Sequence, residues 1–392
     1  MKLELSNRVQ ILSESMTIAI SSLARSMKAA GEDVISLSAG EPDFDTPKAV
    51  KEAVIEAMEK GASKYTASAG TPECLKAVAY KLKNENNLNY STSDIITSVG
   101  AKHSLFSVFS ALINKGDEVI IPVPYWVTYP EIVKYCGGVP VFVQGDKNNK
   151  LKITAGDLKK AITPRTKAFV IGSPSNPSGS VYSKKELLEF ADVLKDTNIT
   201  VISDEIYEKI NYVGDFVSVA ALNDDMFERT ITINGLSKSA AVTGWRFGYL
   251  ASPQKNLIAA IKKLQSQSVS NISSIVQAGA IPALLGKCNE DVKKMLAAYK
   301  ERRDWFVNAI NSVSGLSVIK PEGAFYLFVD CGEVEKDSLK FCKKLLENEK
   351  VATVPGIGFG MDGYFRASFA TDLESIKKGF SRIEKFVKNY KA

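Results

Sequence analysis

Histidine is almost absent from this sequence, since the 392 residues contain only His103. A Ser-His-Asp triad would have to use that residue, and the G-x-S-x-G turn that presents the serine in one large hydrolase fold does not occur. Metal sites built from several histidines are excluded, and no metal site is expected. An enzyme of this composition that moves protons near neutral pH has to use a carboxylate, a lysine of lowered pKa or a cofactor.

Cysteine pairs, long apolar runs and blocks of one charge are also missing. No segment reaches the roughly 18 apolar residues of a membrane span, and the first ten residues lack the apolar core of a signal peptide. The net charge of +6 is spread along the chain among acids and apolar residues, so neither a membrane nor nucleic acid is expected as a partner. The odd number of cysteines without a C-x-x-C pair predicts free thiols in a reducing cytoplasm: Cys74, Cys136, Cys288, Cys331 and Cys342.

The pattern that is present predicts two domains. Between residues 46 and 285, short apolar runs alternate with amphipathic segments, which is typical of an α/β fold with a mostly parallel sheet and helices on both faces. Ser183 and Glu186 have the spacing of a capping box at the start of one of these helices. Residues 1–45 and 286–392 predict a smaller α+β domain, and a long helical stretch from Pro253 to about Leu285 is expected to join the two.

Polar residues follow three successive apolar strands of the larger domain. The run "AFVIG" leads to Asn176, "TVIS" leads to Asp204 and Tyr207, and "ITIN" leads to Lys238. Spacings of about thirty residues suit successive strand–helix–strand crossovers. Because ligands bind beyond the carboxyl ends of parallel strands, we expect these four side chains to converge on one crevice.

Each of these residues also has an ordinary structural interpretation. Asp204 could cap a helix, Asn176 could belong to a proline-rich turn, Tyr207 could be a core residue and Lys238 could lie in a loop. Their common position at strand ends favours a shared site over four unrelated structural roles.

The chemistry of such a site is suggested by Lys238 itself. A lysine normally has a pKa of about 10.4, and desolvation or a nearby cation such as Arg246 lowers it and makes the amine a nucleophile. A lysine that forms a Schiff base, together with an aspartate to pair a pyridinium nitrogen, describes a pyridoxal phosphate site. The strand and helix start in "SVGAKHS" around Gly100 would provide backbone N–H groups for the phosphate, and Arg246 could add a charged contact.

Over nearly its whole length the chain resembles the fold-type-I pyridoxal phosphate enzymes, and among them the class I aminotransferases of the bacterial aspartate aminotransferase type. The order and spacing of the motifs carry this resemblance more than any one of them. The motifs are "LSAGEPDFDTP", "KYTASAGTPE", "VGAKHSLF", "PYWVTYPE", "SPSNPSG", "SDEIYE", "NGLSKSAAVTGWRFGYL", "PEGAFYLF" and "FRASFAT".

The resemblance implies roles for the residues at the matching positions. Lys238 would hold the cofactor as a Schiff base and then act as general base and acid. Asp204 would pair the ring nitrogen, Tyr207 and Asn176 would bond the phenolic oxygen of the cofactor, and Trp126 would stack on its ring. Trp126 and Asn176 would also contact the substrate.

The resemblance further implies how the phosphate and the substrate are bound. Arg366 would grip the substrate α-carboxylate, and the Gly40 backbone would close over it. Tyr65 would reach the phosphate site of the neighbouring subunit, which implies a homodimer with shared active sites. The remaining phosphate residues would be Gly100, Ala101, Lys102, Ser237 and Arg246.

Substrate choice depends on the surroundings of Lys102. In the subgroup that the chain resembles, a lysine at this position and a nearby Ser-x-Thr, here Ser15 to Thr17, can bind the distal carboxylate of aspartate. Relatives that also use prephenate have a lysine two residues before that Ser-x-Thr, where this sequence has Ser13. The expected reaction is therefore ping-pong transfer between L-aspartate and 2-oxoglutarate, with aromatic, alanine or prephenate-type substrates as alternatives.

Three other functions remain as alternatives. "GFGMDG" at Gly358–Gly363 fits a dinucleotide-binding pattern, but the following "YFRASFA" predicts a strand where that site needs a helix. A ligand-sensing regulator would need an additional DNA-binding segment. Another pyridoxal phosphate reaction on the same fold, such as that of a β-lyase, would use the same residues.

Overall fold

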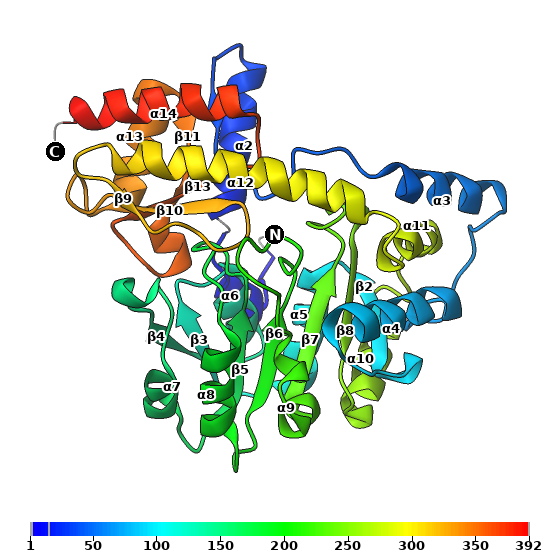
Figure 1. Cartoon of the computed structure of the whole chain (residues 1–392). Helices are drawn as coiled ribbons and strands as arrows, with labels where there is room; N and C mark the ends of the chain where they lie inside the picture. The colour runs from blue at the N-terminus through cyan, green and yellow to red at the C-terminus, as the bar shows by residue number, and fades with distance from the viewer. Residues whose placement is uncertain (1–2, 15, 391–392) are drawn as a thin grey trace.

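A seven-stranded sheet forms the centre of the larger part of the fold (Figure 1). The structure is a computed structural model that describes residues 3–14 and 16–390 apart from the side chain of Thr17. β8 runs antiparallel to both of its neighbours, and the other adjacent pairs are parallel, so the prediction of a mostly parallel sheet is confirmed. In spatial order the strands are β2 (Ile95–Val99), β8 (Phe247–Ala251), β7 (Thr230–Gly235), β6 (Thr200–Asp204), β5 (Thr166–Gly172), β3 (Glu118–Val123) and β4 (Val139–Gln144).

Helices cover both faces of this sheet because alternate strand residues bury their side chains on opposite sides. Val119 and Ile121 pack on one side, whereas Ile120 packs on the other. The first side is covered by α5 (Ala101–Leu112), α6 (Thr128–Tyr135) and α10 (Lys255–Ser268). The second is covered by α7 (Ala155–Ala161), α8 (Lys184–Leu194) and α9 (Asp224–Arg229). Beside the β2 edge, α3 (Lys48–Glu59), α4 (Pro72–Asn86) and α11 (Ser274–Leu284) pack together (Figure 1).

Local sequence signals explain where several of these helices begin. The predicted capping box is present at α8, where Glu186 N–H donates to the Ser183 hydroxyl at 3.3 Å and Ser183 N–H donates to the Glu186 carboxylate at 2.8 Å. The stretch predicted as one joining helix up to Leu285 is instead two helices, α10 and α11. The helical conformation is interrupted between them, where Ser270 adopts a φ of 62°, outside the right-handed helical region.

A smaller set of strands and helices forms the second part of the fold. Antiparallel strands pair in the order β12 (Val354–Pro355), β13 (Tyr364–Ser368), β10 (Tyr326–Asp330) and β9 (Ser317–Val318). β1 (Ile35–Ser36) pairs with β11 (Val351–Ala352), so an N-terminal segment and a C-terminal segment belong to the same part of the fold. The helices here are α2 (Met16–Ala29), α12 (Asn289–Asn311), α13 (Ser338–Glu349) and α14 (Leu373–Lys388). The α+β character agrees with the sequence, whereas the domain boundaries at 45/46 and 285/286 stay a prediction.

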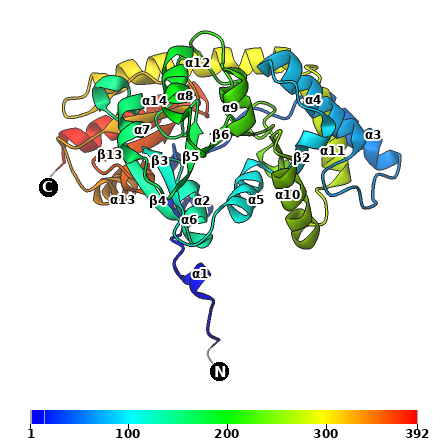
Figure 2. The ribbon, with the colours of Figure 1, turned by 90° about the horizontal axis from the view of Figure 1, so that it is seen from below.

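Residues 3–12 form an arm that extends away from the rest of the fold (Figure 2). α1 (Asn7–Gln10) has no buried residue, and Leu3 and Leu5 are 73% and 61% exposed. Short 3-10 turns complete the fold: η1 (Thr92–Asp94), η2 (Lys147–Asn149), η3 (Val219–Ala221), η4 (Thr243–Trp245) and η5 (Gly356–Phe359). Among the described residues, none of the helices has both the length and the apolar character needed to cross a membrane.

Candidate active site

A cavity of about 320 Å³ opens beyond the carboxyl ends of the central parallel strands. The polar residues that follow β5, β6 and β7 all line it, so the predicted convergence of these strand ends is confirmed. Its size falls in the range of small-molecule sites. Of the predicted site residues, those on its wall are Gly40, Ala101, Lys102, Trp126, Asn176, Asp204, Tyr207, Ser237, Lys238, Arg246 and Arg366.

Lys238 lies just beyond the end of β7 with its ammonium group directed into this cavity. Its Nζ donates to the Gly40 carbonyl and lies 5.9 Å from the ring centre of Tyr207. Desolvation, followed by the positive charge of Arg366, lowers the pKa of this lysine to about 8, and Arg246 contributes less. The cation expected to act on Lys238 was Arg246, and the structure assigns the larger effect to Arg366.

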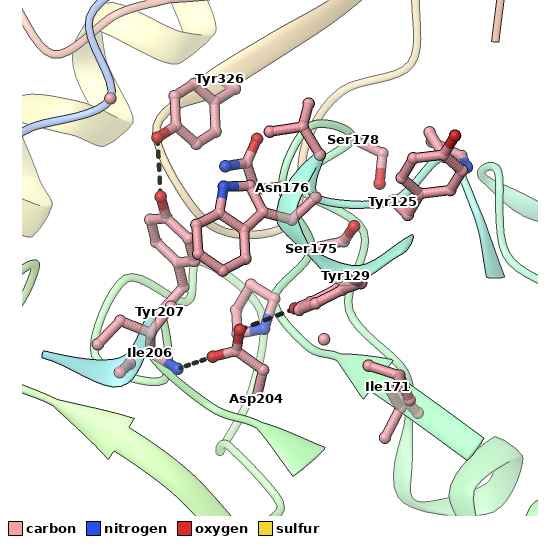
Figure 3. A pocket seen from close by; sticks show the side chains of 18 of the residues that line it. Tyr125, Tyr129, Ile171, Ser175, Asn176, Ser178, Asp204, Ile206, Tyr207 and Tyr326 are labelled. Carbon is pink, nitrogen blue, oxygen red and sulfur yellow. Dashed lines mark hydrogen bonds between the residues drawn. The ribbon is translucent and has the colours of Figure 1, made fainter. Parts of the chain in front are cut away.

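Asp204 ends β6 on the floor of the cavity and is buried. Its Oδ2 accepts a hydrogen bond from the Tyr129 hydroxyl at 2.8 Å, and its Oδ1 accepts a longer one from Ile206 N–H at 3.3 Å (Figure 3). Burial raises the pKa of this carboxyl, while these bonds and the charge of Lys238 oppose the rise. A buried carboxylate in this position would be stabilised by a cationic ligand group.

The N-terminus of α5 lies on the cavity wall and is in close contact with β8. Gly100, at φ 80°, precedes the helix, and a β-carbon at this residue would lie 2.6 Å from Arg246 Nη2. A β-carbon on Gly248 would lie 2.4 Å from Ala101 N, so glycine is required for the strand and the helix start to approach. The first N–H groups of a helix have no partner within it, and with the Arg246 guanidinium they form a site for an anion.

Arg366 approaches the cavity from β13 in the smaller part of the fold. Nη1 donates to Asn176 Oδ1 at 3.0 Å, and Nη2 donates to the Ser38 carbonyl at 2.9 Å. Its guanidinium lies 4.2 Å from the ring centre of Tyr326. Nε is buried and has no hydrogen-bond partner within the described chain.

Two tyrosines and two further residues complete the wall. The hydroxyls of Tyr207 and Tyr326 are 2.7 Å apart, and burial raises the pKa of both, so they remain protonated near neutral pH (Figure 3). Lys102 Nζ lies 5.0 Å from the ring centre of Trp126. Desolvation, and to a lesser extent Arg246, lowers the pKa of Lys102, although part of its side chain remains exposed to solvent.

With this geometry in view, comparison with known proteins identifies the family. Residues 32–383 match the family model described as aminotransferase class I and II. The chain belongs to this family. It is 45% identical to the aspartate aminotransferase of Bacillus subtilis, over 99% of this chain and 100% of that protein. It is 44% identical to the aspartate/prephenate aminotransferase of Nitrosomonas europaea, over 97% and 99% of the two chains. The crystal structure of the aspartate aminotransferase from Rhizobium meliloti superposes with a TM-score of 0.95 at 40% identity, covering 100% of both chains.

Two predicted site residues of this aminotransferase lie outside the cavity wall. Gly100 lies behind the start of α5, where it allows the helix to approach Arg246. Tyr65 is 89% exposed and lines a separate surface hollow with Met58, Lys64 and Val269. Ser15 and the Thr17 side chain, which are predicted to assist Lys102, lie outside the described residues. His103 is a neighbour of the turn, where its Nδ1 accepts from Val99 N–H at 3.4 Å.

Three further residues of this aminotransferase contact a predicted site residue although their sequence context predicted no role at the site: Tyr129, Tyr326 and Ser38. Tyr129 is in the motif "PYWVTYPE", one helical turn after Trp126, and that spacing could have indicated that both face the cavity. Tyr326 and Ser38 come from segments far away in sequence, and only the packing of the smaller part of the fold brings them to the cavity.

The family is one of pyridoxal phosphate enzymes, and the residues on the cavity wall fit that cofactor. Lys238 provides an amine of lowered pKa, and Asp204 a buried carboxylate that favours a cation. The start of α5 with Arg246 provides donors for a phosphate. Trp126 provides an aromatic face on the same cavity. This donor set matches each polar end of the cofactor and its ring.

Proposed function

We propose that this aminotransferase binds pyridoxal 5'-phosphate and transfers an amino group reversibly between L-aspartate and 2-oxoglutarate, forming oxaloacetate and L-glutamate. The observation that carries the choice of substrate is the pair of cations on one cavity, Arg366 buried in the wall and Lys102 beside Trp126. A dicarboxylic substrate has one carboxylate for each. The names of the Bacillus subtilis and Rhizobium meliloti relatives support the same substrate.

The residues that would hold the cofactor follow from the fit described above. Lys238 would attach it, Asp204 would pair its ring nitrogen, and Trp126 would stack on its ring. The phosphate would lie against the N–H groups of Ala101 and Lys102, with Ser237 and Arg246 beside it and Gly100 allowing the approach. When bound, pyridoxal phosphate supplies an electron sink for the α-carbon of the amino acid.

The chain's own groups then bind the amino acid and move its proton. The Arg366 guanidinium would grip the α-carboxylate as a planar fork, with Asn176 and the Gly40 backbone beside it. The amine of Lys238, with its pKa near 8, is a base of suitable strength to take the α-proton near neutral pH and to return it. Tyr207, a protonated donor, would bond the phenolic oxygen of the cofactor.

Prephenate is the second candidate, because the Nitrosomonas europaea relative is named for both substrates. Position 13 argues against it. Ser13 is exposed, and its N–H donates to the Glu131 carboxylate at 2.8 Å. The position therefore offers a neutral side chain beside an acid, which disfavours an additional substrate carboxylate.

A homodimer with shared sites is the assembly that we propose, with Tyr65 of each subunit serving the partner's phosphate site. The high exposure of the Tyr65 ring and of apolar Met58 in the same hollow supports this arrangement. We further propose that the protein works in the cytoplasm, which is consistent with five cysteines that are all free thiols.

A half-reaction scan tests the substrate. Purified protein loaded with pyridoxal phosphate is mixed with single amino acids, and the change in cofactor absorbance is followed. We expect conversion with L-aspartate and L-glutamate, and much slower conversion with alanine or phenylalanine. No conversion with either dicarboxylate would show that the proposed substrate is wrong.

The attachment residue has its own test. Borohydride reduction should fix the cofactor to the lysine that holds it, and peptide mapping should locate the label on Lys238. Lys238→Ala should take up no reducible cofactor. A label on any other lysine would contradict the proposed site.

A further inference from the structure

Tyr129 is a buried residue of the cavity to which the mechanism above gives no role. It is 6% exposed, and its hydroxyl donates to Asp204 Oδ2 at 2.8 Å (Figure 3). Burial, and then the adjacent Asp204 carboxylate, raise the pKa of this hydroxyl well above its usual value. The hydroxyl therefore remains a hydrogen-bond donor across the pH range in which the protein would work.

Contacts of its backbone, ring and hydroxyl fix the position of Tyr129. Tyr129 N–H donates to the Trp126 carbonyl at 3.0 Å, in the turn that begins α6. The two rings meet edge to face, with centroids 5.5 Å apart and an interplanar angle of 83°. On the β5 side, a β-carbon on Gly172 would lie 3.0 Å from the Tyr129 hydroxyl, so the strand passes closely behind it. Such a donor can fix the direction of its acceptor.

The acceptor, Asp204, has capacity left for a ligand. A carboxylate offers about four acceptor positions, and the described contacts with Tyr129 and Ile206 use two. Burial disfavours the ionised form of Asp204, and among the contacts that oppose this the hydrogen bond from Tyr129 has the largest effect, ahead of Ile206 N–H and the charge of Lys238. A charge-assisted bond from a fixed hydroxyl both stabilises the anion and restricts its rotation.

We infer that Tyr129 is a positioning residue, whose hydroxyl keeps the Asp204 carboxylate ionised and oriented so that it holds the protonated ring nitrogen of the cofactor. The inference rests on the proposed function. It adds a residue that acts on the cofactor only through Asp204.

The test measures the state of the cofactor ring rather than turnover. Pyridoxamine phosphate labelled with ¹⁵N in its ring binds without a covalent link, so its affinity and its nitrogen chemical shift report on Asp204. In Tyr129→Phe we expect binding to weaken by about tenfold, since a hydrogen bond to a charged group is lost. The nitrogen signal should move toward that of the neutral ring.

Tyr212→Phe is the matched control. Its partly buried hydroxyl also makes one hydrogen bond, to the Ala324 carbonyl at 2.6 Å, and Tyr212 does not line the cavity. It should leave the affinity and the nitrogen signal at their native values. A double-mutant cycle separates positioning from a general loss of stability. In an Asp204→Asn background, Tyr129→Phe should cause no additional loss of affinity.

The outcomes distinguish this inference from the function on which it rests. If the native protein fails to bind pyridoxamine phosphate, the proposed function is wrong. If the native protein binds it with a protonated ring and Tyr129→Phe gives the same affinity and the same signal, the role of Tyr129 is wrong while the function stands. An equal loss in the native and Asp204→Asn backgrounds would likewise overturn the role of Tyr129.

Discussion

At the scale of single residues, the lowered pKa of Lys238 comes from where the fold places it. The amine is desolvated in the cavity, and Arg366 lies close enough to disfavour a second positive charge. Arg366 itself is held by Asn176 and the Ser38 carbonyl, so its position is fixed before any substrate binds. The residue expected to bind the substrate carboxylate therefore also lowers the pKa of the lysine.

This arrangement predicts the pH dependence of cofactor uptake. Only the neutral amine attacks, so the rate at which the cofactor-free protein takes up pyridoxal phosphate should rise with pH and level off above about pH 8. Arg366→Gln removes a cation and should move the midpoint to higher pH, whereas Arg25→Gln, on the exposed side of α2, should not. Stopped-flow absorbance measures the rate. A native midpoint near the ordinary lysine value of about 10.4 would contradict the prediction.

Lys102 predicts a selective effect on substrates. Lys102→Ala should lower kcat/KM for L-aspartate by about tenfold, because it removes one partly exposed ion pair with the substrate, worth roughly 1.4 kcal/mol. The kcat/KM for L-alanine should not change. Lys262→Ala, an exposed lysine on α10, is the control and should change neither. Steady-state kinetics with both amino acids decide the matter. Equal losses for the two substrates would mean that Lys102 serves the phosphate turn alone.

At the scale of secondary-structure elements, the proposed phosphate site depends on how closely β8 approaches α5. A β-carbon on Gly248 would meet Ala101 N at 2.4 Å, with no flexible side chain to move aside. Gly248→Ala should therefore displace the helix start and weaken pyridoxamine phosphate binding. Overpacking of this kind should also cost about 1–3 kcal/mol in the free energy of unfolding.

The matched control for Gly248→Ala is Gly244→Ala. No atom lies within 4 Å of a β-carbon built there, and the residue belongs to the neighbouring 3-10 turn η4. Titration with pyridoxamine phosphate and urea unfolding compare the two variants. Native affinity in Gly248→Ala would show that the approach of β8 to α5 is not needed for the site.

The elements were largely predictable from the sequence because their signals are local. Apolar runs identified β5, β6 and β7 of the central sheet, and Ser183 with Glu186 identified the start of α8. The antiparallel β8 carries no local sign of its direction, because its neighbours are chosen by long-range pairing. The break at Ser270 and the contact of Tyr129 with Asp204 depend on tertiary packing in the same way.

At the scale of the whole molecule, the predicted site residues that the structure describes in full all line one cavity of the chain except Gly100, behind the helix start, and Tyr65. Tyr65 is 89% exposed, and an exposed arm carrying Leu3 and Leu5 extends from the fold (Figure 2). The proposed dimer would bury them and bring Tyr65 to the partner's phosphate site.

Mixing variants tests this sharing of sites. Lys238→Ala and Tyr65→Ala protomers, unfolded together and refolded, should form heterodimers in which one site has both defects and the other has neither. If subunits pair at random in a closed two-fold dimer, about half of the dimers are heterodimers and about a quarter of all sites are intact. The activity of the mixture should therefore exceed that of either variant alone. The control is a mixture of Lys238→Ala with Asp204→Ala, whose defects lie in the same subunit's site. It should regain nothing, because every site in its heterodimers keeps one defect. No recovery in the first mixture would mean that Tyr65 acts within its own subunit or not at all. Recovery in the control would mean that Lys238 and Asp204 do not serve the same subunit's site.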